Sequence, residues 1–341
     1  MKILPLEKNP WIQAYQLRNY ELGLLQEKVP WVYNKYINIY YDGIRFGHLM
    51  PESRYFELEG VMDVQRFKLD KSVFSLGIID YVSWFSELIE NGWYIYTFLD
   101  DYYIQAKTAV YHQIHFRHTS LLYGVDEEKQ IFYAIGYIED QKYKDFTIPF
   151  DVFRCAISTN FDRKNEPFIK KAIDRVEFDA FRINSEYKFE FNLKEIYEGI
   201  TNYLGSSNPQ NRDKQGHIYG INCERAFINY IKQNENGRLD PRFSRFFMEM
   251  KDIMYRRLDY LGNEGYISNQ NKDLYALLSK KQTTIHLLFL KYNLKHRSET
   301  INYICEIMEE IIRDEVNILM EVKNELHKKL KEQEDELYCL T

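Results

Sequence analysis

The hydrophobic pattern near the end of the chain constrains the fold more than any other feature of the sequence. Between Ser298 and Gln333, residues recur on one face at mostly three- and four-residue steps, which is the period of an amphipathic α-helix. The residues on this face are Ile301, Ile304, Met308, Ile311, Glu315, Leu319, Val322 and Leu326. The pattern predicts one long helix of a bundle, with a coiled-coil end.

The two halves of the chain have different patterns. Helical spacing continues through residues 192–204, 222–234, 240–262 and 271–294. The first half instead contains the β-forming run "WYIYTFL" (93–99), followed by "HTSLLYGV" and "QIFYAIGYI" on either side of the turn "DEEK". These last two runs predict a hairpin, and "DFTIPF" a further strand. We therefore expect an α+β protein with an N-terminal domain at residues 1–160 and a helical domain at 161–341.

Two helices are expected in the first half. In "NPWIQAYQLRN", Asn9 can cap the free N–H groups and Pro10 suits the first helical position. In "SLGIIDYVSWFSELIENGW", Ser75 can cap the helix and the pair Asn91-Gly92 ends it. The segment 30–44 between them is predicted to be extended or to form a short helix.

Composition excludes several functional classes. Hydrophobic residues make up 45% of the chain, and its net charge is −6. This balance does not favour nucleic-acid binding, and an acidic partner would need a local basic patch. The four cysteines are scattered without paired spacing, as reduced thiols are. The sequence has no signal core and no apolar run of about 20 residues, so we expect a cytoplasmic protein that does not bind membranes.

Histidines are the most promising chemical groups. His112, His115 and His118 recur every three residues, but a strand places alternate residues on opposite faces. We therefore expect no metal site, and the sequence has no glycine-rich phosphate loop that would suggest a cofactor. A histidine directly ahead of an apolar strand can instead act as a general base beside a cysteine thiolate.

Two segments resemble a known family. "HFRHTSLLYGVDEEKQIFYAIGYIED" (115–140) and "NGWYIYTFLDDYYI" (91–104) are similar to motifs of the family named for the N-terminal domain of butirosin biosynthesis protein H. The resemblance implies a papain-like cysteine-protease fold and acyl transfer of the closthioamide amide synthase type. The acyl group would pass from the phosphopantetheine thioester of an acyl or peptidyl carrier protein to a small amine, in natural-product biosynthesis.

The resemblance also assigns the catalytic positions. The family's nucleophilic cysteine belongs near the start of the first helix, where this chain has Ala14. His118 is the expected base because it immediately precedes the apolar run. The orienting acid should follow the next strand, and Asp140 is the candidate there; otherwise the base works without a third group.

Further residues are expected around the substrate. A side-chain amide of Asn9 or Gln13, together with the backbone N–H of Ala14, could stabilise an oxyanion. Asp101 could bind the incoming amine. The remaining substrate-binding candidates are Tyr15 and His115, although His115 could also face a carboxylate. Arg256 and Arg257 are candidates for contact with a carrier protein, or for a solvated helix face.

The alanine at position 14 leaves alternatives open, because alanine has no nucleophile and cannot form an acyl-enzyme. One is an engineered replacement of the native cysteine, which would trap a substrate complex. Another is a natural pseudoenzyme that binds a carrier protein without catalysing. A peptidase-like hydrolase of the same fold is a further alternative for the native chemistry.

Overall fold

The structure is a computed structural model of the 341-residue chain. It describes residues 1–49, 60–70, 80–138, 142–159, 175–208, 216–235 and 237–339. The chain forms two compact units, and several segments contribute to each. Unit 1 comprises Met1–Pro10, Tyr20–Leu24 and Glu52–Tyr187, whereas unit 2 comprises Trp11–Asn19, Leu25–Pro51 and Lys188–Thr341.

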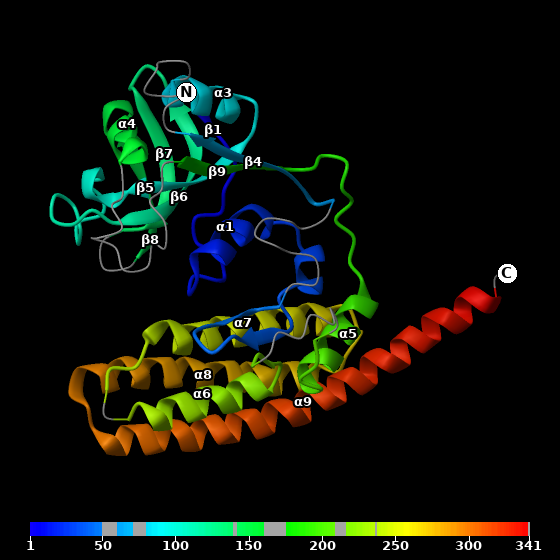
Figure 1. The fold of residues 1–341 in the computed structure, drawn as a ribbon. Coiled ribbons are helices and arrows are strands. Elements are labelled where there is room, and N and C mark those ends of the chain that lie inside the picture. The colour runs from blue at the N-terminus through cyan, green and yellow to red at the C-terminus, as the bar shows by residue number, and fades with distance from the viewer. Residues whose placement is uncertain are drawn as a thin grey trace. The chain divides into compact units, whose positions relative to one another are not determined.

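An antiparallel sheet forms the centre of unit 1 (Figure 1). Its strands, in spatial order, are β4 (Met62–Asp70), β9 (Arg175–Ile183), β5 (Tyr94–Asp100), β6 (Arg117–Asp126), β7 (Ile131–Tyr137) and β8 (Tyr143–Pro149). A short strand, β1 (Lys2–Ile3), pairs with β6. The predicted hairpin is therefore confirmed as β6 and β7, and the strand predicted from "DFTIPF" as β8.

Two helices pack aromatic side chains against this sheet. They are α3 (Tyr81–Glu90) and α4 (Phe150–Ser158). The ring of Phe85 in α3 lies 4.6 Å from that of Phe178 in β9 and 5.4 Å from that of Phe153 in α4. Burial of such rings stabilises a core by about 25 cal/mol for each Å² of apolar surface. The core of unit 1 therefore lies between the sheet and these helices.

Unit 2 is mainly helical. Its helices are α5 (Leu193–Leu204), α6 (Asn222–Gln233), α7 (Pro241–Asn263), α8 (Asn269–Lys295) and α9 (Ser298–Cys339). Helix α9 is the long helix predicted from the sequence, and its C-terminal turns extend past the other helices of the bundle (Figure 1). A small sheet of β10 (Ile218–Tyr219), β2 (Ile39–Tyr41) and β3 (Phe46–His48) completes the unit. The expected α+β arrangement with antiparallel sheets is confirmed.

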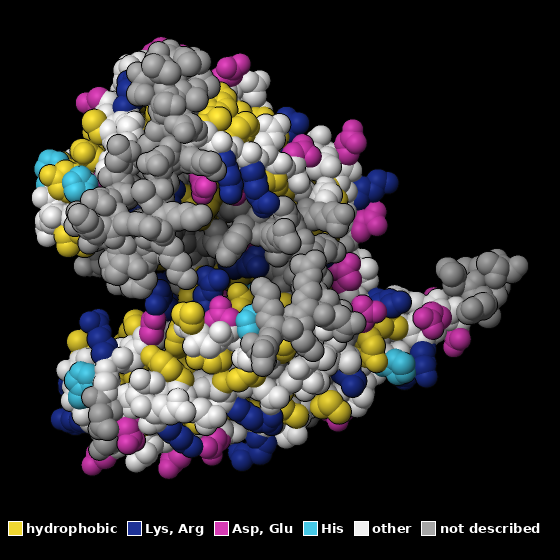
Figure 2. All heavy atoms as spheres, in the orientation of Figure 1, with side chains coloured by type: hydrophobic (Ala, Val, Ile, Leu, Met, Phe, Trp, Pro, Cys, Tyr) yellow, Lys and Arg dark blue, Asp and Glu magenta, His cyan; other side chains and the backbone are white. Residues whose placement is uncertain are grey.

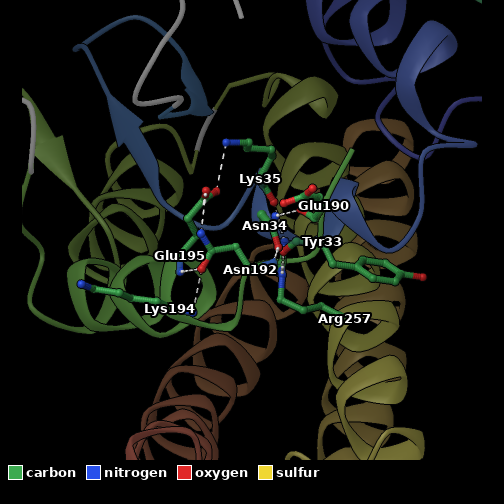
Figure 3. A network of polar contacts seen from close by, with 8 residues as sticks. All are labelled: Tyr33, Asn34, Lys35, Glu190, Asn192, Lys194, Glu195 and Arg257. Atoms are coloured by element: carbon green, nitrogen blue, oxygen red, sulfur yellow. Dashed lines mark hydrogen bonds and ion pairs between the residues drawn. The ribbon is translucent and has the colours of Figure 1, made fainter. Parts of the chain in front are cut away.

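The short 3₁₀ helix η1 (Trp31–Asn34) is tied to the bundle by polar contacts (Figure 3). The guanidinium of Arg257 donates to the carbonyl oxygens of Tyr33 and Lys35, both at 2.6 Å. The side-chain amide of Asn34 donates to the carbonyl of Glu190 at 3.0 Å. Arg257 is fully buried, which lowers its pKa to about 10. Its role is therefore to satisfy backbone carbonyls inside the unit.

A buried ionic cluster joins three helices of the bundle. The ammonium of Lys251 in α7 contacts the carboxylates of Glu224 in α6 and Glu315 in α9, and all three side chains have no exposed surface. The hydroxyl oxygen of Tyr203 lies within hydrogen-bond distance of both side chains, 2.5 Å from Glu224 Oε1 and 2.9 Å from Glu315 Oε2. Tyr275 donates to Glu315 at 2.5 Å. Because buried charges are costly without partners, these five groups hold one another in place.

Two predicted boundaries differ from the structure. Helix α1 spans Gln16–Leu25, so the prediction of a helix start at Asn9 and Pro10 is wrong. The backbone N–H of Asn9 instead bonds to its neighbour Glu7, whose Oε1 accepts it at 2.6 Å. Helix α3 is capped by Asp80, which accepts the N–H of Ser83 at 3.0 Å; the proposed cap Ser75 lies outside the described residues.

The division into units also differs from a single cut at residue 160. Strand β9 belongs to unit 1 because it pairs with both β4 and β5. The segment 25–51, which precedes most of unit 1 in sequence, belongs to unit 2. Within the described part of the chain, no helix is long and apolar enough to cross a membrane.

Candidate active site

The end of β5 and the start of β6 bring acidic and imidazole side chains together in unit 1. The antiparallel register sets Leu99 opposite His118 and Asp100 opposite Arg117. The chain then turns through η2 (Asp101–Tyr103). Asp100 at the end of β5 and Asp101 at the start of η2 therefore lie close to His115, just before β6, and to His118, its second residue.

The first pair is Asp100 and His115. The Nδ1 of His115 lies 2.6 Å from Oδ2 of Asp100, a short distance typical of a charge-assisted hydrogen bond. The other oxygen of Asp100 accepts the N–H groups of Tyr102 at 3.2 Å and Phe116 at 3.1 Å. The imidazole stacks on Tyr102, with ring centroids 4.1 Å apart. His115 is therefore held by a carboxylate, the alternative that we stated for it.

The second pair is Asp101 and His118. The Nδ1 of His118 lies 3.4 Å from Oδ2 of Asp101. The side chain of Asp101 is only 3% exposed, whereas that of His118 is 30% exposed and can be reached from solvent. The Oδ1 of Asp101 is buried without a hydrogen-bond partner among the described residues. This geometry gives His118 an orienting carboxylate from the preceding strand end.

A buried lysine completes this group. The Nζ of Lys107 lies 3.7 Å from Oδ2 of Asp101 and donates to the backbone carbonyl of Tyr137. Burial lowers the pKa of Lys107 below 10.5, and the attraction of Asp101 partly offsets this. Lys107 therefore balances the charge of Asp101 inside the unit.

Ala14, the expected position of the nucleophile, belongs to unit 2 and is 5% exposed. Its N–H and that of Gln13 both donate to Oε2 of Glu249 in α7, at 2.8 Å each. Two adjacent N–H groups that converge on one oxygen form a small anion site. In this structure, the carboxylate of Glu249 occupies that position.

Glu249 is itself held by a cation. The Nε of Arg245 donates to its Oε1 at 2.7 Å, and Nη2 of Arg245 donates to the side-chain oxygen of Gln13 at 2.7 Å. Burial raises the pKa of Glu249, and Arg245 together with the two N–H donors offsets this. Gln13, Ala14, Arg245 and Glu249 thus form one polar cluster.

The other predicted residues are distributed as follows. Tyr15 packs its ring 5.9 Å from that of Phe246 within unit 2. Asn9 belongs to unit 1. Asp140 lies outside the described residues. The pairing of Ala14 in unit 2 with His118 in unit 1 stays a prediction.

Of the two arginines considered for partner contact, only one is at the surface. Arg256 is exposed and bonds Asp252 at 2.8 Å. Arg257 has no exposed surface, so it forms neither a solvated helix face nor a docking contact. On the face shown in Figure 2, basic and acidic side chains are interspersed over both units.

Sequence reasoning did not identify four residues of these clusters: Asp100, Lys107, Arg245 and Glu249. Asp100 could have been found, because the doublet Asp100-Asp101 ends a predicted strand. Lys107 lies only six residues from Asp101, but no sequence pattern marks their contact, whereas Glu249 meets its partners Gln13 and Ala14 from more than 230 residues away.

No group of three His, Cys, Asp or Glu side chains in the described ranges is placed to hold a metal ion. The sequence matches no protein-family model and no curated protein. The resemblance to the butirosin biosynthesis protein H family therefore stays a prediction.

Proposed function

We propose that the chain has a papain-like fold and the site of an amide-forming acyltransferase, with position 14 as the place of the nucleophile. The observation that carries the proposal is the buried Asp101 beside the accessible imidazole of His118. In acyl transfer, such a carboxylate fixes the tautomer that donates through Nδ1 and leaves Nε2 to take a proton. The two atoms are 3.4 Å apart, close enough for the contact to tighten into a hydrogen bond when substrate binds.

The proposed reaction has two steps in a protein with a thiol at position 14. His118 takes the thiol proton, and the thiolate attacks the carbonyl carbon of the carrier thioester. The carbon–sulfur bond to the carrier breaks, and the carrier thiol leaves with a proton from His118. An amine then attacks the acyl-enzyme, passes a proton to His118, and forms the amide as the enzyme's own sulfur departs.

A second function is favoured by a different observation. The N–H of Ala14, which should stabilise the oxyanion, already donates to Glu249. Together with the missing thiol, this supports a non-catalytic protein that binds a carrier without turning over its cargo. Glu249 would then take the place of the oxyanion permanently.

Product analysis of the Ala14→Cys variant separates these functions. The variant is incubated with an acyl thioester of N-acetylcysteamine and an excess of a primary amine, and the products are identified by mass spectrometry. Amide that disappears in an Ala14→Cys/His118→Gln control supports the synthase. Free acid as the main product indicates a hydrolase, and the absence of both products supports the binding protein.

A further inference from the structure

Helix α8 has a second apolar strip besides its buried face. Its inner face packs Ile285, Phe289 and Tyr292 into the core of unit 2, each no more than 1% exposed. On the opposite side lie Leu287, Leu290 and Leu294, which are 60%, 39% and 83% exposed. Because residues three and four apart share one face of a helix, these three leucines form a continuous strip.

The strip lies in a strongly basic part of the chain. No Asp or Glu occurs between Asp273 and Glu299. Lys280, Lys291 and Lys295 are exposed, and no described acidic side chain pairs with them. Lys281 differs, because it bonds Glu310 of α9 at 2.6 Å. The outer face of α8 is thus locally positive in a chain whose net charge is −6.

We propose that this outer face binds an acidic amphipathic helix of the carrier protein that delivers the acyl group. The α8 docking face consists of Leu287, Leu290, Leu294, Lys291 and Lys295. The identity of the partner rests on the proposed function, whereas the chemistry of the surface does not. Apolar residues flanked by lysines complement a helix that presents apolar residues flanked by carboxylates.

The dimensions favour a helix over a membrane as the occupant. The leucine strip extends seven residues along α8, roughly 10 Å at 1.5 Å per residue. Two packed helices cross at an angle, commonly about 20° or 50°, so each contacts the other over only a short part of its length. A helix that lies in a membrane interface buries a larger apolar face, commonly with Trp or Phe. The exposed residues of the preceding turn are Thr283 and Thr284. Their hydroxyl groups are polar, so the apolar strip does not continue into that turn.

A fluorescent peptide tests the surface independently of catalysis. The probe is a synthetic peptide of about 18 residues with leucines on one helical face and glutamates beside them, and a scrambled peptide of the same composition is the control. Binding to the full chain is followed by fluorescence anisotropy. We expect Leu287→Ser and the pair Lys291→Glu/Lys295→Glu each to weaken binding by about tenfold or more.

Leu277→Ser is the matched variant. Leu277 is also on α8 and is 57% exposed, close to the 60% of Leu287. It lies ten residues earlier, roughly 15 Å along the helix and about 80° around it, so it should leave peptide binding unchanged. Circular dichroism melts confirm that the variants fold alike.

The proposal is overturned if the acidic peptide does not bind, or if it binds the Leu287→Ser and Leu277→Ser variants equally well. It is also overturned if phosphatidylglycerol vesicles bind through these leucines while the peptide does not. The proposed reaction is tested apart from this surface. Ala14→Cys should process the small N-acetylcysteamine thioester at the same rate with or without Leu287→Ser. If that reaction fails while the peptide binds as expected, the proposed function fails and the α8 docking face stands.

Discussion

The Nδ1 of His118 lies 3.4 Å from the Oδ2 of Asp101, a carboxylate that is almost completely buried. Both residues lie where β5 ends and β6 begins, and the strand register opposes Leu99 to His118. A reachable imidazole next to a buried carboxylate is the arrangement that a general base requires. The proposed function depends on this contact.

Replacement of the carboxylate should remove this orientation. In the Ala14→Cys background, we expect Asp101→Asn to reduce the rate of acyl transfer on the order of 10²–10⁴-fold, because an amide no longer favours the correct imidazole tautomer. Steady-state rates with the small thioester measure the effect. Asp100→Asn is the matched control, since Asp100 bonds His115 instead. A larger loss in Asp100→Asn than in Asp101→Asn would assign the base to His115.

The lysine behind Asp101 should matter mainly for stability. Lys107→Met leaves the buried carboxylate of Asp101 without its cation, a change that typically costs about 3–5 kcal/mol. The double variant Asp101→Asn/Lys107→Met should recover much of this loss. Urea unfolding, followed by circular dichroism, measures the free energy of unfolding of the single and double variants. Equal destabilisation in the single and double variants would show that the two charges do not stabilise one another.

The pH dependence of Lys107 has a definite sign. Burial lowers its pKa below 10.5 in the folded state, so the unfolded chain binds this proton more tightly. The free energy of unfolding should therefore increase as the pH rises toward 10.5. Urea unfolding at several alkaline pH values measures this increase, and Lys107→Met should lack it.

Much of the fold could be predicted from the sequence because the patterns that specify it are local. The β6–β7 hairpin depends on alternating residues around a short polar turn, and α9 on a helical period sustained over many turns. The start of α1 could not be predicted, because the N–H groups of Gln13 and Ala14 are bound by Glu249, which is more than 230 residues away in the sequence. The candidate site could be predicted only in part for the same reason. His118 was proposed from its own neighbours, whereas the contacts of Glu249 join residues more than 230 positions apart.

The buried ionic cluster of unit 2 predicts a pH-dependent stability. Burial raises the pKa of Glu224 to about 8, reinforced by Glu315 and opposed by Lys251. Burial alone would also raise the pKa of Glu315, but Lys251 and the hydrogen bonds hold it below the ordinary value. At neutral pH the folded state therefore keeps a proton on Glu224, whereas Glu315 is ionised.

The sign for Glu224 follows from proton linkage. Between pH 4.5 and 8 the folded state keeps the proton of Glu224 and the unfolded state releases it, so the free energy of unfolding falls as the pH rises. Glu224→Gln should remove this fall, as measured by urea unfolding at several pH values. Glu306→Gln, at an exposed position of α9, is the control. A slope that persists unchanged in Glu224→Gln would contradict the assignment.

The Glu249 cluster predicts a large loss of stability on removal of its carboxylate. Glu249→Leu removes the carboxylate oxygen that accepts the N–H groups of Gln13 and Ala14. At about 1–3 kcal/mol for each buried donor, the expected cost is about 2–6 kcal/mol. Glu249→Gln should cost less, because its amide oxygen can still accept both N–H groups. Similar unfolding curves for the wild type and Glu249→Leu would show that water replaces the carboxylate without loss.

The most direct test of the central claim is the acidity of a thiol placed at position 14. The native thiols other than the buried Cys223 and Cys305 are removed in an Ala14→Cys variant that also carries Cys155→Ser and Cys339→Ser. The rate of iodoacetamide alkylation of the introduced cysteine is then measured against pH. If the imidazole of His118 stabilises the thiolate, the thiol pKa should lie well below the ordinary value of about 8.5, and His118→Gln should return it toward that value. The same pKa near 8.5 with and without His118 would contradict the proposed acyl-transfer site.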